Sequence, residues 1–475
     1  MTADQPEIDA DNRKGVIPPY LVPVFHRIRS LWTRIHRFHF FWETAFAVLL
    51  AVYFAYYYAG FDHGRYKLYV LIGDDIPNTV GEAVRNRLKQ PAQGLKVDGI
   101  DVDTEIIDIP ANSPEYAITT AWSLVKKRDA LLIVGILDSQ PTEHSLPIYF
   151  HARPQVPFIA AVQSNNDLLR NCDTCFDANR PVPLLQLSPT NADQAKWAVK
   201  FAIEQMVSDT PNFLIVSDDR SPNATYVEGL AKAYDKEIPA TDSHLGASIS
   251  SVRAAFSQTH PDCILYAGDA GNAKILLSEL ARAVQNVPAG TPKWLPTVVL
   301  SDTAVPATFQ AVTYERLVNL TDQSDAAYYT DPNQPNAYAL DAVTIAVYIL
   351  RELDERGFDW RYSLKSNLLN HTSAEDIRRN IVRIMREDSK FHSSYRGAND
   401  TGPVSGLNTV YTFNCPSVAA DGSIDRRSNG SVDYCQRYGG IFHVWKWDPQ
   451  NKAMSDVDPW HPRKVAVPRQ HTLPN

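Results

Sequence analysis

Residues 131–150 read "LLIVGILDSQPTEHSLPIYF". The stretch begins as a continuous apolar run and then becomes polar at Asp138, Ser139 and Gln140. An unbroken apolar strand is typical of a parallel sheet that helices cover on both faces. Polar residues at the end of such a strand can catalyse a reaction, hold a ligand or cap the following helix. The stretch therefore predicts a β-α unit with a polar turn of undecided role.

Most of the chain alternates short apolar runs with segments whose apolar residues have helical spacing. Residues 67–73 and 130–136 have the composition of strands, and the segments after them have the period of amphipathic helices. The pattern begins again with a helix at 192–206, which Ser188 or Thr190 is expected to cap. This alternation predicts an α/β fold of two lobes, each built on a mostly parallel sheet, with a cleft between them.

The composition and the missing motifs exclude several functions. The chain has 475 residues and a net charge of −8 without a basic stripe, so we expect no nucleic-acid partner. It has no G-x-S-x-G elbow, no H-E-x-x-H zinc motif and no phosphate-binding loop. We therefore predict no catalytic residue, no metal and no cofactor. An enzyme that uses the carboxylates of Asp218, Asp219 and Asp302 is the less favoured alternative.

Residues 40–59, "FFWETAFAVLLAVYFAYYYA", are apolar over about one bilayer span, and Glu43 is their only charged residue. Basic residues precede this segment, so the positive-inside rule places residues 1–39 in the cytoplasm as a tail. No convincing cleavage site follows, which favours a retained signal-anchor helix over a cleaved signal peptide or a buried core helix. We expect a single-pass cell-membrane protein with its main domain periplasmic or extracellular and a flexible tail at 451–475.

The cysteines fit an exported domain. Cys415 and Cys435 flank a polar loop and are expected to form a disulfide. Cys172 and Cys175 form a C-x-x-C that is redox-active, half of a metal site or a structural loop, and without a histidine at ligand spacing the loop, which a disulfide can close, is favoured. Cys263 lies in an apolar run and is expected to be a buried thiol. Glycosylation sequons occur at Asn223, Asn319, Asn370, Asn399 and Asn429.

Acidic or hydroxyl residues follow five of the strand-like runs. They are Asp74 and Asp75, Asp138 and Ser139, Asp218 and Asp219, Asp269, and Asp302 and Thr303. Ligands of doubly wound sheets sit at these carboxyl ends of the strands. The same residue types are also standard helix caps, so the pattern alone does not separate binding from capping.

The order of segments resembles that of the type I periplasmic binding proteins, typified by branched-chain amino acid receptors. The resemblance rests on "LLIVGILDSQ", "VPFIAAVQSNNDL", "LSPTNADQAKWAVKFAIEQ" and "HPDCILYAGDAGNAKILLSELARA", and it extends from about Arg65 to Leu350. It implies two doubly wound lobes joined by a hinge. The N-terminal lobe would span 66–187, completed by roughly 319–360, and the C-terminal lobe 188–318, completed by part of 361–450.

The resemblance also implies a set of ligand-binding residues. Ser139 falls on the serine that binds a ligand carboxylate, Val162 supplies a backbone contact, and Ser164 stands for a threonine hydroxyl. Tyr226 lines the second lobe, and Asp302 falls on the acid that pairs with an ammonium group. Asp269 replaces an aromatic residue of the family. Asp138 and Gln163 are secondary candidates.

These features predict a membrane-tethered extracytoplasmic domain that closes on a small polar ligand, such as an amino acid or an amide, for transport or sensing. Its partner would be a membrane transporter or a signalling subunit. The alternative is a receptor-like or scaffold subunit that keeps the fold and acts through a membrane partner.

Overall fold

The structure is a computed structural model that divides into two compact units, Met1–Gly64 and Arg65–Asn475. The described residues are 23, 27, 29–30, 32, 42–52, 66–74, 78–89, 102–110, 113–127, 129–153, 155–169, 172, 175, 182–204, 212–217, 224–237, 245–268, 270–285, 295–301, 304, 314, 316–322, 337–357, 374–387, 413–414, 434–437, 442–448, 450–451 and 453–456.

The first sheet of the larger unit has the strand order β11-β12-β5-β4-β3-β1-β2. All its neighbours are parallel except the β11–β12 pair. The strands are β1 (Tyr66–Gly73), β2 (Val102–Ile109), β3 (Ala130–Ile136), β4 (Phe158–Ala160), β5 (Leu184–Gln186), β11 (Phe413–Asn414) and β12 (Cys435–Arg437).

The second sheet has the order β14-β13-β10-β9-β8-β6-β7, and its β6 to β10 strands pair in parallel. The strands are β6 (Phe213–Ser217), β7 (Leu245–Ser248), β8 (Cys263–Ala267), β9 (Thr297–Leu300), β10 (Leu317–Asp322), β13 (Phe442–Asp448) and β14 (Ala453–Asp456). The prediction of two α/β lobes with mostly parallel sheets is confirmed.

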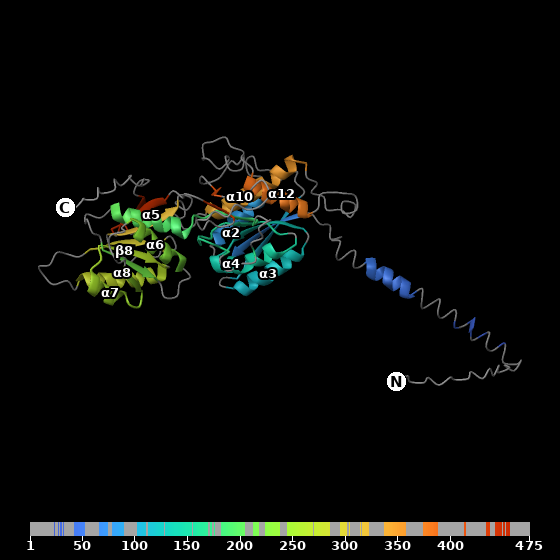
Figure 1. Cartoon of the computed structure of the whole chain (residues 1–475), viewed down its shortest axis with the longest axis horizontal. Helices are drawn as coiled ribbons and strands as arrows, with labels where there is room; N and C mark the ends of the chain where they lie inside the picture. The colour runs from blue at the N-terminus through green and yellow to red at the C-terminus, as the bar shows by residue number, and fades with distance from the viewer. Residues whose placement is uncertain are drawn as a thin grey trace, which may run out of the picture. The chain divides into compact units, whose positions relative to one another are not determined.

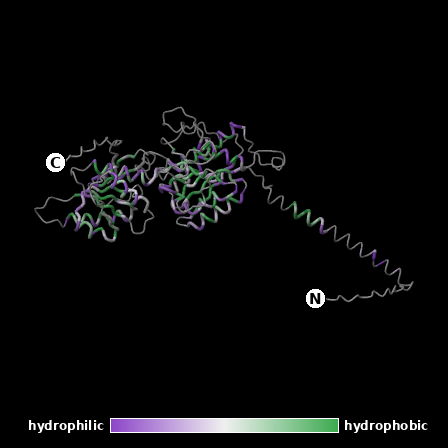
Figure 2. Tube along the Cα trace, in the orientation of Figure 1, coloured by the Kyte–Doolittle hydropathy of each residue, from purple (hydrophilic) through white to green (hydrophobic). Residues whose placement is uncertain are grey.

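Helices cover both faces of each sheet (Figure 1). On the first sheet, α2 (Asn78–Lys89), α10 (Ala337–Glu355) and α12 (Ala374–Glu387) share one core, and α3 (Pro114–Lys126) and α4 (Ser139–His151) share the other. On the second sheet, α5 (Asn191–Glu204) and α6 (Ala224–Glu237) cover one face, and α7 (Val252–Thr259) and α8 (Ala270–Gln285) cover the other. Figure 2 shows apolar residues concentrated in the strands between these layers.

Strand β3 shows why the stretch at 131–150 folds as predicted. All seven of its residues are buried, and β1 and β4 flank it. Gly135 is required because the ring of Phe158 from β4 lies where its side chain would be, and a Cβ there would meet Phe158 Cζ at 2.3 Å. Phe158 in turn packs on Tyr149 of α4, with ring centroids 5.5 Å apart. The glycine thus lets β3, β4 and α4 pack closely.

Two segments differ from the sequence predictions. Strand β10 at 317–322 lies in the second sheet, although residues from about 319 were expected to complete the first lobe; helix α10 does pack on the first sheet. Residues 453–456 were expected to belong to a flexible tail, but they form β14 and pair antiparallel with β13. This pairing provides hydrogen-bond partners for backbone N–H and C=O groups of β13 that would otherwise be unpaired at the edge of the sheet.

In the smaller unit, residues 42–52 are helical, and their apolar side chains are exposed, among them Phe46 and Leu49 at 65% each. None of the helices among the described residues is long and apolar enough to cross a membrane.

Candidate functional site

The candidate residues of the first lobe lie where β3 and β4 end, at one edge of the sheet. Ser139 is the first residue of α4 and is half-buried. Asp138 occupies the N-cap position, is exposed, and makes no capping hydrogen bond with its side chain. The structure thus places Asp138 at the N-cap position without a side-chain capping bond, and a ligand-binding role for this turn stays a prediction.

Gln163, in the turn after β4, is fully buried. Its Nε2 donates to Thr142 Oγ1 at 2.9 Å and to the carbonyl oxygen of Leu137, and lies 3.4 Å from that of Gly135. Gln163 therefore ties the turn after β3 to the turn after β4. The half-buried Val162 and Ser164 flank it, and Val162 packs against the core.

Gln186, at the end of β5, extends this network, and the sequence analysis did not single it out. Its Nε2 donates to the carbonyl oxygens of Gln163 at 2.8 Å and Asn165 at 3.0 Å. Its Oε1 accepts from Tyr434 Oη at 3.1 Å and from Gln436 Nε2 at 2.9 Å. Burial raises the pKa of Tyr434 well above its ordinary value. A glutamine inside the apolar run "VPLLQL" was the available signal, since buried amides need partners.

The start of α5 is anchored to the same edge. The backbone N–H of Asn191 donates to the carbonyl oxygen of Ser164 at 2.6 Å, and that of Ala192 donates to Asn166 Oδ1 at 2.7 Å. Thr190 Oγ1 accepts from the backbone N–H of Asp193 at 3.1 Å, which confirms the predicted cap. The segment leading into the second lobe is therefore fixed to the turn that carries Ser164.

The second-lobe candidates are only partly described. Tyr226 lies in the first turn of α6 and is buried in the core beneath it, with 3% of its surface exposed. The structure does not describe Asp269, Asp302, Asp218 and Asp219, which lie outside the residues given above. A buried bond from Ser301 Oγ to the carbonyl oxygen of Gly268, 2.7 Å long, joins the ends of β8 and β9.

Asn319, one of the sequons, has a structural role. It is fully buried, and its Nδ2 donates to the carbonyl oxygens of Ser301 at 3.1 Å and Ala304 at 3.0 Å. An amide nitrogen enclosed in this way leaves no room for an attached glycan in the folded protein. The other sequons, Asn223, Asn370, Asn399 and Asn429, lie outside the described residues.

Cys172 and Cys175 form a disulfide. Cys435 is also disulfide-bonded, while Cys415 lies outside the described residues. Cys263 is a free, buried thiol, and its burial raises its pKa.

A charged cluster lies away from these strand ends. Lys67 Nζ contacts Glu105 Oε2 at 2.8 Å and Asp129 Oδ2 at 3.8 Å. The hydrogen bond to Glu105 raises the pKa of Lys67. Burial raises the pKa of Glu105, but the contacts with Lys67 and Lys127 outweigh it and hold that pKa below its usual value. Burial raises the pKa of Asp129. Lys67 and Lys127 thus favour the ionised form of Glu105, whereas burial disfavours the ionised form of Asp129.

Comparison with known proteins shows which of them share this fold. No protein-family model matches the sequence, and no curated protein matches it in sequence. Among solved structures, a type 1 periplasmic binding protein from Bordetella pertussis Tohama I matches with a TM-score of 0.52 at 15% identity, covering 83% of this chain and 100% of that one. The chain has the fold of the type I periplasmic binding proteins.

Two further structures of this fold match. One is an ABC transporter substrate-binding protein from Desulfitobacterium hafniense in complex with Leu, with a TM-score of 0.52 at 11% identity, covering 82% of this chain and 100% of that one. The other is a fatty acid ABC transporter substrate-binding protein from Thermomonospora curvata, with a TM-score of 0.51 at 12% identity, covering 84% and 93%. The shared fold thus serves chemically different ligands.

Proposed function

We propose that this protein is an extracytoplasmic solute-binding domain that closes on a small polar ligand and delivers it to a membrane transporter or sensor, and that it is not an enzyme. The observation that supports this proposal most is that, in this fold, the turns after β3 and β4 carry polar residues. Those turns present half-buried Ser139 and Ser164 at the edge of the sheet where ligands of this architecture bind.

The chemistry of the first lobe suits an anionic group such as a carboxylate. Ser139 begins a helix of 13 residues, so its hydroxyl lies beside backbone N–H groups at the positive end of the helix dipole. Gln163 is fully buried among carbonyl oxygens, so its amide holds the two turns together and we assign it no ligand contact. In the second lobe we propose Asp302, with Asp269, as the groups that face the opposite end of the ligand. Because Tyr226 is buried in the core beneath α6, we assign it no ligand contact.

We propose further that residues 40–59 anchor the protein in the membrane. The described part of this segment, 42–52, is helical and exposes its apolar side chains, which in water would be unfavourable. Deleting residues 40–59 should move the protein from the membrane fraction to the soluble fraction. A deletion variant that stays in the membrane fraction would refute the anchor and leave the binding proposal intact.

The binding proposal is tested by thermal unfolding of the full chain with amino acids, amides, polyamines, sugars and fatty acids. A ligand that binds only the native state raises the Tm with its concentration. For a carboxylate ligand, Ser139→Ala should weaken binding about tenfold or more, since a hydrogen bond to a charged group contributes about 1.5–3 kcal/mol.

The matched control is Ser257→Ala, which removes an exposed hydroxyl whose hydrogen bond goes to the carbonyl oxygen of Arg253 on its own helix. It should bind as the wild type does. If no compound raises the Tm, the binding proposal fails and the receptor-like or scaffold alternative gains. If a carboxylate ligand binds Ser139→Ala and the wild type equally, the assignment of Ser139 fails.

A further inference from the structure

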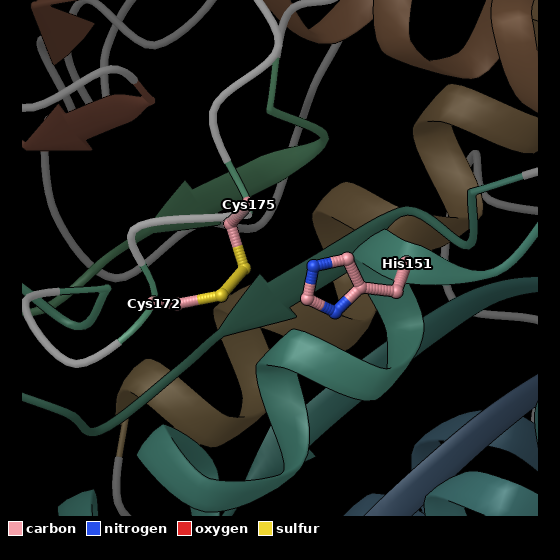
Figure 3. Close-up of side chains that lie close together, drawn as sticks. All are labelled: His151, Cys172 and Cys175. Carbon is pink, nitrogen blue, oxygen red and sulfur yellow. A yellow bond between two sulfur atoms is a disulfide. The ribbon is translucent and has the colours of Figure 1, made fainter.

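His151 lies beside the Cys172–Cys175 disulfide, and the three side chains form a compact group (Figure 3). One ligand atom from each residue lies within 4.8 Å of the other two. The histidine comes from the last residue of α4, and the cysteines come from the segment between β4 and β5. In the sequence, His151 is too far from the cysteines to be recognised as part of a C-x-x-C metal motif. The fold brings its side chain next to them.

Backbone hydrogen bonds hold the two cysteines of this group in place. The N–H of Cys175 donates to the carbonyl oxygen of Cys172 at 3.1 Å, and the N–H of Cys172 donates to that of Leu169 at 2.8 Å. Both cysteines are buried in the core shared with α4, with 5% and 3% of their surfaces exposed. The His151 side chain is exposed, so a solute can approach from its side.

The chemistry of the group favours a thiophilic cation. Two sulfurs at C-x-x-C spacing and one imidazole are the preferred ligands of Zn²⁺, and three protein ligands leave a fourth position for water. The C-terminal end of α4 also favours positive charge, because the unpaired carbonyl groups there carry partial negative charge. With the disulfide closed, the sulfurs are not thiolates and cannot bind a cation strongly.

We propose that reduction of the Cys172–Cys175 disulfide creates a cation site of two thiolates and the His151 imidazole, so that metal binding here is gated by redox state. A dithiol reductant supplies two electrons, the S–S bond breaks, and the dithiol is oxidised to its own disulfide. The two protons it brings are released to solvent when Zn²⁺ binds both sulfurs. His151 is 12 residues from Ser139 on α4, about 18 Å along the helix, so this site is separate from the proposed ligand site.

The test uses the full chain, reduced with dithiothreitol, freed of reductant without air, and titrated with Zn²⁺ against a chromophoric chelator. The reduced wild type should bind one zinc ion more than the reduced Cys172→Ser/Cys175→Ser variant, which keeps the other cysteines. The oxidised protein should lack that zinc. His151→Ala should weaken the added site more than about tenfold, since even outer-shell losses reach that size. His144→Ala, which removes an exposed imidazole from the same helix, should leave it unchanged.

A second measurement remains decisive even if the reduced, metal-free protein unfolds. Zinc that binds the dithiol form stabilises it, so the midpoint potential of the Cys172–Cys175 couple should rise with free Zn²⁺. The rise is about 30 mV for each tenfold increase above the dissociation constant. A midpoint potential that does not change with zinc would overturn the proposal and leave a structural disulfide. Equal zinc binding by the wild type and the double serine variant, or by His151→Ala, would overturn it as well.

Discussion

Replacing Gly135 with alanine should destabilise the first lobe. A Cβ at this position would lie 2.3 Å and 2.6 Å from two ring carbons of Phe158, so the ring or the strand must move by about 1 Å to reach an ordinary contact. The ring cannot move freely, because Phe158 is fully buried and packs on Tyr149. Overpacking of this kind costs about 1–3 kcal/mol.

The cost should be measured as a loss of unfolding free energy in urea, with Gly246→Ala as the matched control. Gly246 lies in edge strand β7, and a Cβ there meets no atom within 4 Å. Its replacement should be neutral or stabilising by about 0.5–1 kcal/mol, because alanine has less backbone freedom to lose on folding.

A second substitution tests the cause of the effect. Replacing Phe158 with the smaller leucine should relieve the clash, so Gly135→Ala should cost less in a Phe158→Leu background, with a coupling of about 0.5–3 kcal/mol. Because the carbonyl of Gly135 lies against the Gln163 amide, the single variant should also bind ligand more weakly. A Gly135→Ala protein within about 0.5 kcal/mol of the wild type, or no coupling to Phe158, would refute the packing argument.

Three further predictions concern buried polar and charged groups. Gln163→Leu should lower the unfolding free energy by about 1–3 kcal/mol, because it leaves the buried carbonyl of Leu137 unpaired; urea unfolding tests this, and no loss would contradict it. Asn319 should appear unmodified by peptide mass analysis from a glycosylating host, since it is buried in the folded protein; a glycan there would contradict its placement. The wild type should be more stable than Glu105→Gln above pH 4.5, and this advantage should shrink as the pH falls further, because a lowered folded-state pKa makes the ionised form stabilising. The advantage should stay below about 1 kcal/mol, because the ion pair is half-exposed. An advantage that grows as the pH falls would contradict the sign.

The fold was predictable where local pattern and topology agree. The run at 131–136 is apolar throughout because helices cover both faces of β3, and the same reasoning holds for β1 and β8. The C-terminal strands were not predictable in this way. Strand β12 pairs with β5 across about 250 residues and β13 with β10 across more than 100, and short strands whose partners are so distant carry no local signal of the sheet they join.

The candidate site shows the same division. Ser139 and Ser164 follow strand ends that the sequence reveals, so their position at the sheet edge could be predicted. Gln163 was a ligand candidate because of the family resemblance. It is fully buried and hydrogen-bonded to the carbonyl oxygen of Leu137, a contact that only the register of β3 against β4 determines. His151 joins the cysteines only through the length of α4, and for that reason sequence spacing did not reveal it.

The buried amides also bear on which ligands the first lobe can select. Gln163 and Gln186 donate to main-chain carbonyls, so they stiffen the turns that carry Ser139 and Ser164. The ligand that we propose for these turns would meet hydroxyls and backbone N–H groups, which suit an anionic group but discriminate weakly among anions that present the same oxygens. The exposed carboxylate of Asp138 lies next to Ser139 on the same turn. Under the proposed function, selectivity for the rest of the ligand must come from the second lobe. Substitutions at Asp302 should therefore change which ligand binds, whereas Ser139→Ala should weaken all carboxylate ligands alike, and a ligand-dependent effect of Ser139→Ala would contradict this division of roles.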